Sequence, residues 1–339
     1  MLYISTRNPR DTYTSYRALH EENAPDGGMY VPFQKLVLSQ DDLKKLNTEG
    51  FGETVAKILN RYFSARLTGW DVECAVGRNP VKLTSLGRRT IVGELWHNLD
   101  QTYSSLEMCL YGLMTGNRKK PAGWPAIAIR IAVICGMMGE LHRGGIQDVD
   151  IAVAAGDFST PMAIWYCRQM GLPIGMILCG CNENGVLWDL LHRGECNTGA
   201  SVVKTNLPEL DIAFPAYLEQ LIFATQTREE FARFQDIVSA GGVYTADEEG
   251  AAAITEKLCA SVVGSTRADS VIASVYRTND YFIDPITALV YGGLQDYRAR
   301  TGENRMTVLL ADYSPKCYAE RIANAIGISG RELMSRLRV

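Results

Sequence analysis

The turn from Gly156 to Thr160 is the first place in the chain where residue types and spacing could do chemistry. It leads from the apolar run Ile151 to Ala155 into a helical run. Unpaired N–H groups at a helix start, together with the positive end of the helix dipole, attract anions. The turn Gly156, Asp157, Phe158, Ser159, Thr160 is therefore a candidate phosphate site. Asp157 brings its own negative charge and only one glycine permits close approach, so a capped helix without a ligand is the alternative.

His97 is the second candidate. It lies in the run Glu94-Leu95-Trp96-His97-Asn98, at the end of an apparent strand. Ligand sites in open α/β sheets lie at such ends, but a histidine there can equally be a hydrogen-bonded packing residue. The hydroxyl-rich stretch Thr102 to Ser105 follows, without the Gly-x-Ser-x-Gly pattern of a serine nucleophile around it. Residue types alone thus give an α/β protein with one weak anion turn.

The nine cysteines do not indicate a metal centre. They form no Cys-x-x-Cys pair and none lies beside a histidine at zinc-ligand spacing. We interpret them as small hydrophobic residues of a protein in the reducing cytoplasm. In particular, we expect Cys179-Gly180-Cys181 to pack at a strand end rather than to bind metal.

A strand–helix–strand unit must position the turn. Ile151 to Ala155 and Ile174 to Cys179 are short apolar runs typical of strands buried on both faces. The helical run between them ends near Met170, with Thr160 as the expected N-cap and Pro161 at the first helical position. Such a unit predicts two parallel strands joined by a right-handed crossover.

Other segments complete an α/β protein with a parallel-rich sheet flanked by helices and a small α+β N-terminal part. Expected strands are Leu2–Ser5, Met29–Pro32 and Thr307–Ala311, and expected helices are Phe51–Phe63, Pro285 to about Arg298 and a closing helix through Ile326. The run Ala24-Pro25-Asp26-Gly27-Gly28 has the residues of a tight turn.

Composition narrows the function classes. The chain has 339 residues, 47% hydrophobic and 21% charged, with a net charge of −4. It is long enough for a large packed core, which excludes a small disulfide-stapled module. The mild acidity argues against nucleic-acid binding, and we expect the one compact basic run, Arg118 to Lys120, to be a solvated loop.

Neither export nor membrane insertion is predicted. Met1 to Arg7 is too polar for a secretory signal. Ala126 to Met138 is interrupted by Arg130 and is shorter than the roughly 20 residues of a membrane span, so we expect a buried helix.

Several ordered motifs resemble those of the threonine synthases, which are pyridoxal-phosphate (PLP) enzymes of fold type II. The matching runs are Tyr3-Ile4-Ser5-Thr6-Arg7, Ala24-Pro25-Asp26-Gly27-Gly28-Met29-Tyr30-Val31-Pro32, Glu94-Leu95-Trp96-His97, Met170-Gly171-Leu172-Pro173-Ile174, Asn182-Glu183-Asn184-Gly185-Val186-Leu187 and Asp284-Pro285-Ile286-Thr287-Ala288. They keep the family's order over nearly the whole chain. The resemblance implies common ancestry and a fold-type-II core.

The resemblance also implies a lysine that this chain lacks. In the family a lysine follows the histidine run and forms a Schiff base with PLP, which then acts as an electron sink. The aligned position here is Ser104, and no lysine lies between Lys82 and Lys119. A hydroxyl cannot form an imine, so we expect no PLP unless another lysine replaces the lost one, for example Lys82 or Lys316.

Two further positions depart from the family pattern. The phosphate-binding Gly-Asn-Phe-Gly turn of the family is Gly156-Asp157-Phe158-Ser159 here, which replaces a neutral amide by a carboxylate. The serine or threonine that faces the pyridine nitrogen aligns with Leu310 or Ala311, or with Asp312 after a one-residue shift. Both changes weaken the expected cofactor site.

The resemblance implies a domain loss as well. The family has a small α/β domain between the lysine helix and a segment resembling Ser-Ile-Asn-Trp-Gly-Arg, whereas Leu113 to Pro121 here leads almost at once to Gly123-Trp124-Pro125. We expect residues 1–93 to form a threonine-synthase-like N-terminal part and residues 94–339 a truncated PLP-fold-II-like core. Loss of one wall would leave the cleft open to water.

Three functions remain open. The first is a pseudoenzyme without PLP that acts as a binding or partner protein, as a homo-oligomer or with a homologous protein, with an amino-acid-like small molecule as its ligand. The second is a PLP-independent enzyme whose active site is the cleft that holds PLP in the family, with His97, Ser104, Asp157 and Thr287 as candidate catalytic residues. The third is an authentic threonine synthase, converting O-phosphohomoserine to threonine, with a relocated lysine. Convergence of three candidates in one pocket would support the second.

Overall fold

A six-stranded sheet forms the centre of the protein in the computed structural model, which describes residues 1–97 and 102–337. Its strand order is β10 (Leu258–Val262), β7 (Ile174–Cys181), β6 (Val149–Ala154), β11 (Thr307–Ala311), β5 (Thr90–Glu94) and β4 (Lys82–Ser85). Neighbouring strands are parallel except for the antiparallel pair β4 and β5. The expected α/β fold with a parallel-rich sheet is therefore confirmed.

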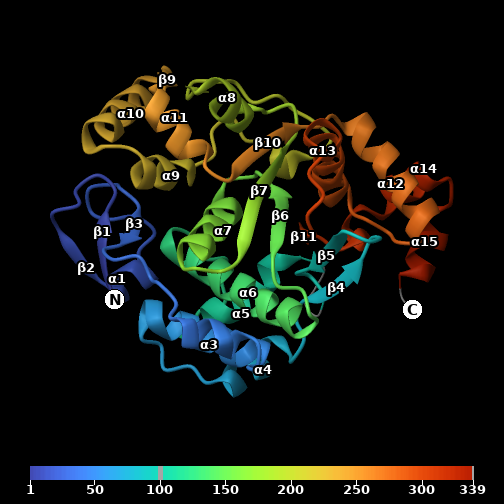
Figure 1. Cartoon of the computed structure of the whole chain (residues 1–339), viewed down its shortest axis with the longest axis horizontal. Coiled ribbons are helices and arrows are strands. Elements are labelled where there is room, and N and C mark those ends of the chain that lie inside the picture. The colour runs from blue at the N-terminus through green and yellow to red at the C-terminus, as the bar shows by residue number, and fades with distance from the viewer. Residues whose placement is uncertain (98–101, 338–339) are drawn as a thin grey trace.

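Helices cover both faces of the sheet (Figure 1). In β11, Val308 and Leu310 pack into the core on the side of α6 (Trp124–Arg143) and α7 (Ser159–Gln169). The alternate residues Leu309 and Ala311 pack on the side of α12 (Ser265–Asn279) and α13 (Pro285–Thr301). Burial on both faces explains why these strands are continuous apolar runs.

The longest helix, α6, is a core helix. It has the length and apolarity of a membrane span, but 89% of its most apolar 18-residue window is buried inside the protein. It packs against α3 (Phe51–Phe63) and α7. The expected buried helix over Ala126 to Met138 is confirmed.

The N-terminal part is a small α+β unit. Its antiparallel sheet has the order β2 (Thr12–Thr14), β1 (Leu2–Ser5), β3 (Tyr30–Pro32). Its helices are α1 (Ser15–His20), α2 (Gln40–Leu46), α3 and α4 (Gly69–Val76). The expected boundary between residues 93 and 94 falls inside β5, so the central sheet takes strands from both expected parts.

A second peripheral layer, for which the sequence analysis gave no elements, spans residues 186–255. It contains α8 (Val186–Arg193), β8 (Glu195–Asn197), the 3-10 helix η1 (Pro208–Leu210), α9 (Leu218–Thr225), α10 (Arg228–Ala240), β9 (Val243–Thr245) and α11 (Glu248–Thr255). The chain closes with η2 (Pro315–Tyr318), α14 (Ala319–Ile326) and α15 (Gly330–Arg336). In Figure 1, α9 and α10 lie beside the N-terminal sheet.

The β6–α7–β7 unit has the expected parallel pairing, with one local correction. Helix α7 begins at Ser159 with Phe158 as N-cap, rather than at Pro161 after a Thr160 cap. The cause is Asp157, whose Oδ1 accepts a hydrogen bond from the Ser159 backbone N–H at 2.9 Å and so starts the helix two residues earlier. The expected packing role of Cys179 and Cys181 is confirmed, since both are buried in β7.

Candidate functional site

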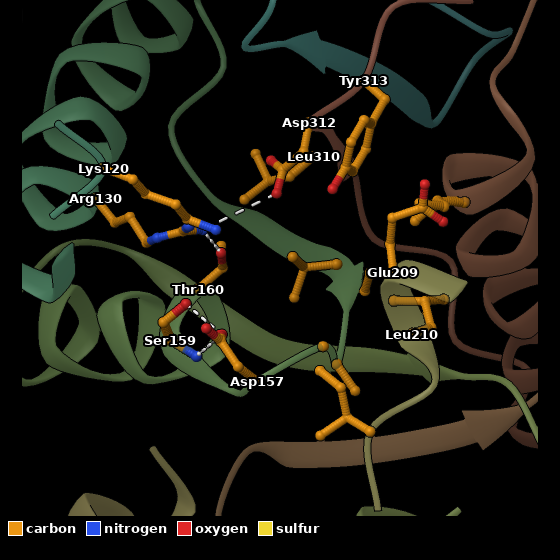
Figure 2. Close-up of a pocket in the computed structure, with 16 residues that line it drawn as sticks. Lys120, Arg130, Asp157, Ser159, Thr160, Glu209, Leu210, Leu310, Asp312 and Tyr313 are labelled. Carbon is orange, nitrogen blue, oxygen red and sulfur yellow. Dashed lines mark hydrogen bonds and ion pairs between the residues drawn. The ribbon is translucent and has the colours of Figure 1, made fainter. Parts of the chain in front are cut away.

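A cavity of about 190 Å³ lies where β6 and β11 end and α7 begins (Figure 2). Its lining includes Gly156 and Asp157 from the turn, Ser159 and Thr160 from α7, and Leu310 and Asp312 at the end of β11. This is the carboxyl edge of the parallel strands, the usual location of sites in open α/β sheets. The cavity therefore lies at the turn that the sequence analysis selected as a candidate anion site.

The turn is occupied by its own carboxylate. Asp157 Oδ1 accepts hydrogen bonds from both the backbone N–H and the Oγ of Ser159. Phe158 has a left-handed backbone (φ 71°) and a buried ring, and this burial also holds the turn in its conformation. A phosphate at this helix start would meet the Asp157 charge and would have to compete for the Ser159 N–H. The turn is thus a self-capped helix start.

A buried ion network fills the other side of the cavity. Arg130 Nε on α6 lies 2.9 Å from Glu107 Oε1 on α5 (Tyr103–Thr115), and Arg130 Nη1 lies 3.9 Å from Asp312 Oδ2. Nη1 also donates to Thr160 Oγ1, and the guanidinium carbon lies 4.9 Å from the centre of the Tyr103 ring. The network joins α5, α6, α7 and the end of β11.

Burial sets the electrostatics of this network. Glu107 is fully buried, and desolvation raises the pKa of its carboxyl to about 7 although Arg130 acts in the opposite direction. Burial also disfavours the charged guanidinium of Arg130, but the neighbouring Glu107 carboxylate outweighs it and leaves the Arg130 pKa raised. Arg130 is therefore a permanent positive charge in the wall of the cavity.

Asp312 brings a second carboxylate to the cavity. Burial, the dominant cause, raises the pKa of Asp312, while Arg130 and Lys120 favour its charged form. Its Oδ1 is buried without a hydrogen-bond partner in the part of the chain that the structure describes. Asp312 lines the cavity, and this oxygen lacks the hydrogen bond that a buried carboxylate oxygen normally accepts.

Lys120 adds a second cation. It belongs to residues 116–123, which link α5 to α6, and it lines the cavity while remaining exposed. In Figure 2 its side chain extends alongside Arg130 toward the cavity. The run Arg118 to Lys120 is thus an exposed loop as expected, and Lys120 also lines the cavity.

Of the four candidate catalytic residues, the structure places only Asp157 on the described lining of this cavity. His97 lies in the turn after β5, with Nδ1 at 3.6 Å from Glu94 Oε2. Ser104 lies in the first turn of α5, and Thr287 is buried in the first turn of α13, where its N–H donates to Asp284 Oδ1. The convergence expected for a PLP-independent enzyme is therefore not seen. The neighbouring expected residue Asn98 lies outside the described residues.

The strand alternation removes one of the three positions at the end of β11 from the cavity. Leu310 and Asp312 line the cavity, whereas Ala311 packs on the opposite face of the sheet. The proposed replacement lysines Lys82 and Lys316 do not line the described cavity wall. Lys82 instead lies on the edge strand β4, with Nζ 3.9 Å from Glu94 Oε2.

Sequence reasoning missed Arg130, Glu107 and Lys120 as site residues. A signal was present for the first two, because each interrupts an otherwise apolar helical run. A charged residue at a buried helical position needs a charged or hydrogen-bonding partner. Lys120 had no such signal, because its direction depends on the path of the link between α5 and α6.

The residues present do not fit PLP, the cofactor that the family resemblance implies. The tether position on α5 is a serine, the Ser159 N–H of the phosphate turn already bonds to Asp157, and a paired guanidinium lies in the cavity wall. Lys120 is an amine at the cavity, but no phosphate cradle accompanies it. No step of chemistry through PLP follows from this arrangement.

Known proteins resemble the chain in both sequence and fold. The family model "Threonine synthase N terminus" matches residues 2–78. A threonine synthase of Corynebacterium glutamicum is 31% identical over 189 residues, which cover 53% of this chain and 39% of that protein. Human threonine synthase-like 1 is 26% identical over 148 residues, 42% of this chain and 19% of that protein. The chain thus matches about two fifths or less of the length of these curated relatives.

Solved structures extend the likeness over the whole fold. A PLP-bound threonine synthase from Brucella melitensis superposes with a TM-score of 0.88 at 17% identity, covering 97% of this chain and 92% of that one. The yeast threonine synthase gives 0.83 at 16% identity, covering 96% and 90%. The N-terminal segment is thus similar in sequence to threonine synthases, and the chain as a whole has their fold.

Proposed function

We propose that this protein has lost PLP-dependent catalysis and binds a small amino-acid-like molecule in the cavity at the end of β6 and β11. The observation that carries the proposal is the Asp157 carboxylate, which accepts the hydrogen bond of the Ser159 N–H in the phosphate turn. A cofactor phosphate there would face a negative charge, and Ser104 offers no amine for its aldehyde.

The charges around the cavity support a zwitterionic ligand. Lys120 and Arg130 are cationic, whereas Asp157, Glu209 and Asp312 are acidic, and all five line the same cavity (Figure 2). An α-carboxylate would be attracted to Lys120 and Arg130, and an α-ammonium to Asp312, whose Oδ1 has no partner among the described residues. A simple anion or a simple cation would meet charges of its own sign.

The binding test uses L-serine and L-threonine as zwitterionic probes. Titration calorimetry should show binding of at least one of them, with acetate and ethanolamine, which carry one charge each, binding at least tenfold more weakly. Asp312→Asn should weaken binding of the amino acid, whereas acetate, which no longer meets this negative charge, should bind as well as before or better. Equal binding of the amino acids and of acetate would contradict the zwitterion proposal.

Lys120 supports one second candidate function, an authentic threonine synthase with a relocated lysine. To test it, the protein is mixed with PLP, reduced with borohydride and examined by near-visible absorption, next to Lys120→Ala. We expect no reducible chromophore. A chromophore in the wild type that is lost in Lys120→Ala would overturn the proposed loss of PLP chemistry. One that persists in Lys120→Ala would move the search to other lysines and overturn it as well.

A partner chain is the second part of the proposal. The link between α5 and α6 is only residues 116–123, where the family resemblance implies a small domain, and the cavity residue Lys120 is exposed there. We propose that a second copy of this chain or a homologous protein covers this side. Sedimentation of the purified protein should show self-association, or association with a co-expressed homologue. A protein that stays monomeric at all concentrations and does not associate with the homologue would contradict this proposal.

A further inference from the structure

A second cavity, of about 450 Å³, lies between the segment that follows β1 and helices α9 and α10. It shares no lining residue with the cavity at β6 and β11. We propose that it binds a small aromatic molecule that carries a carboxylate or phosphate group. The inference is independent of the function proposed above.

Three arginines give this cavity a positive lining. Arg7 and Arg10 come from the segment after β1, and Arg228 from the first turn of α10. Within residues 1–97 and 102–337, their guanidinium groups form no ion pair or hydrogen bond, and no carboxylate is among the lining residues. In a chain of net charge −4, three unpaired cations around one cavity are an anion-attracting surface.

Two nearby acidic side chains, Glu219 and Asp11, already accept hydrogen bonds. Glu219 Oε1 accepts a hydrogen bond from Thr6 Oγ1 at 2.6 Å, and Asp11 Oδ2 accepts one from Asn8 Nδ2 at 2.8 Å. These contacts hold Thr6 and Asn8, which line the cavity, in place. The arginines are therefore left to an external anion, and their planar guanidinium groups suit the paired oxygens of a carboxylate or phosphate.

Aromatic rings make the apolar part of the lining. Phe223 and Phe231 lie edge to face, with ring centres 5.2 Å apart, and the Phe33 side chain across the cavity is 53% exposed. Exposed phenylalanine beside other rings offers a stacking surface for a flat ligand. The volume lies within the roughly 300–1,000 Å³ typical of small-molecule sites. An aromatic acid satisfies both the rings and the arginines.

The test uses 8-anilinonaphthalene-1-sulfonate, a fluorescent aromatic anion, with the full chain. We expect one site per chain. The double variant Arg10→Gln/Arg228→Gln should bind the probe about tenfold more weakly, as loss of charge-assisted hydrogen bonds predicts. Arg331→Gln, at an exposed arginine of α15, is the matched control and should bind as the wild type does. Unchanged binding in the double variant would overturn the proposal.

The aromatic part is tested separately. Phe33→Ser should weaken probe binding, whereas Trp70→Ser, which removes another exposed aromatic side chain (67% exposed), should not. Circular dichroism checks that each variant is folded. Displacement of the probe by benzoate or by phenyl phosphate would identify the acid group, while displacement by neither, or many weak sites per chain, would refute a built site.

Discussion

Replacing Arg130 by methionine should destabilise the protein in a pH-dependent way. The substitution removes the guanidinium whose Nε lies 2.9 Å from Glu107 Oε1, and leaves that carboxyl fully buried without its cation. At an effective dielectric constant of ~20, the lost attraction is about 6 kcal/mol. The carboxyl avoids most of this cost by taking up a proton.

The pKa of Glu107 sets how much stability the variant loses. In the wild type, the Glu107 pKa is raised to about 7. Without Arg130 it rises further, so above pH 7 the folded variant holds a proton that its unfolded chain has lost. The free energy of unfolding of the variant then falls, relative to the wild type, by about 1.4 kcal/mol per pH unit. Between pH 7 and pH 9 the added loss is about 3 kcal/mol.

Urea unfolding at pH 6 and pH 9, followed by tryptophan fluorescence, measures this difference. At pH 6 the variant should lose the Thr160 hydrogen bond, the Tyr103 ring contact and the Asp312 ion pair, about 1–3 kcal/mol together. The double variant Arg130→Met/Glu107→Leu is the control, because without the Glu107 carboxyl most of the added loss at pH 9 should vanish. An equal loss at both pH values, or a pH dependence that persists in the double variant, would refute the reasoning.

Three further predictions concern the backbone, a buried cap and the turn. Gly123→Ala should lower the melting temperature far more than Gly302→Ala. Both glycines have positive φ, but only a Cβ at Gly123 would meet a backbone oxygen, 2.2 Å away. Equal shifts of the melting temperature in calorimetry would contradict this prediction. Burial raises the pKa of Asp284 to about 6. The contribution of Asp284 to the free energy of unfolding is therefore full below about pH 4 and falls by about 3 kcal/mol as the pH rises through 6. Asp284→Asn, which can still cap α13, should lack this pH dependence of stability in urea titrations. Asp157→Asn should increase affinity for inorganic phosphate at the start of α7 by about tenfold, since it removes a charge and keeps an acceptor for the Ser159 N–H; unchanged calorimetry would show that the charge does not control this turn.

Apolar runs and caps predicted the parts of the fold that are locally encoded. The helix Phe51–Phe63 and the strand Thr307–Ala311 have the expected bounds because their apolar periods are interrupted by polar residues at both ends. Residues 186–255 were not predicted, because their short helices are separated by irregular segments and depend on packing against the rest of the protein. The start of α7 was misplaced because a side chain, Asp157, supplied the cap from outside the helix.

Of the candidate site, only the position of the turn at Asp157 could be predicted from the sequence. The turn at Asp157 follows a buried strand, so its place at the sheet edge follows from topology. Arg130 and Glu107 lie on different helices and meet through the packing of α5 on α6, which no local pattern reveals. His97, Ser104 and Thr287 were chosen by residue type and by alignment with the family, and neither of these criteria states which side of an element faces the cavity.

The central place of β11 has a consequence for the order of events during synthesis. Residues 307–311 follow all the other strands of the six-stranded sheet in the chain, yet they form the only bridge between β5 and β6 within the described sheet. Until they arrive, the nascent polypeptide holds two half-sheets with open hydrogen-bonding edges, which are templates for wrong association. We therefore expect the central sheet to close only when residues 307–311 are available, and fragments that stop short of residue 307 to require chaperones to stay in solution.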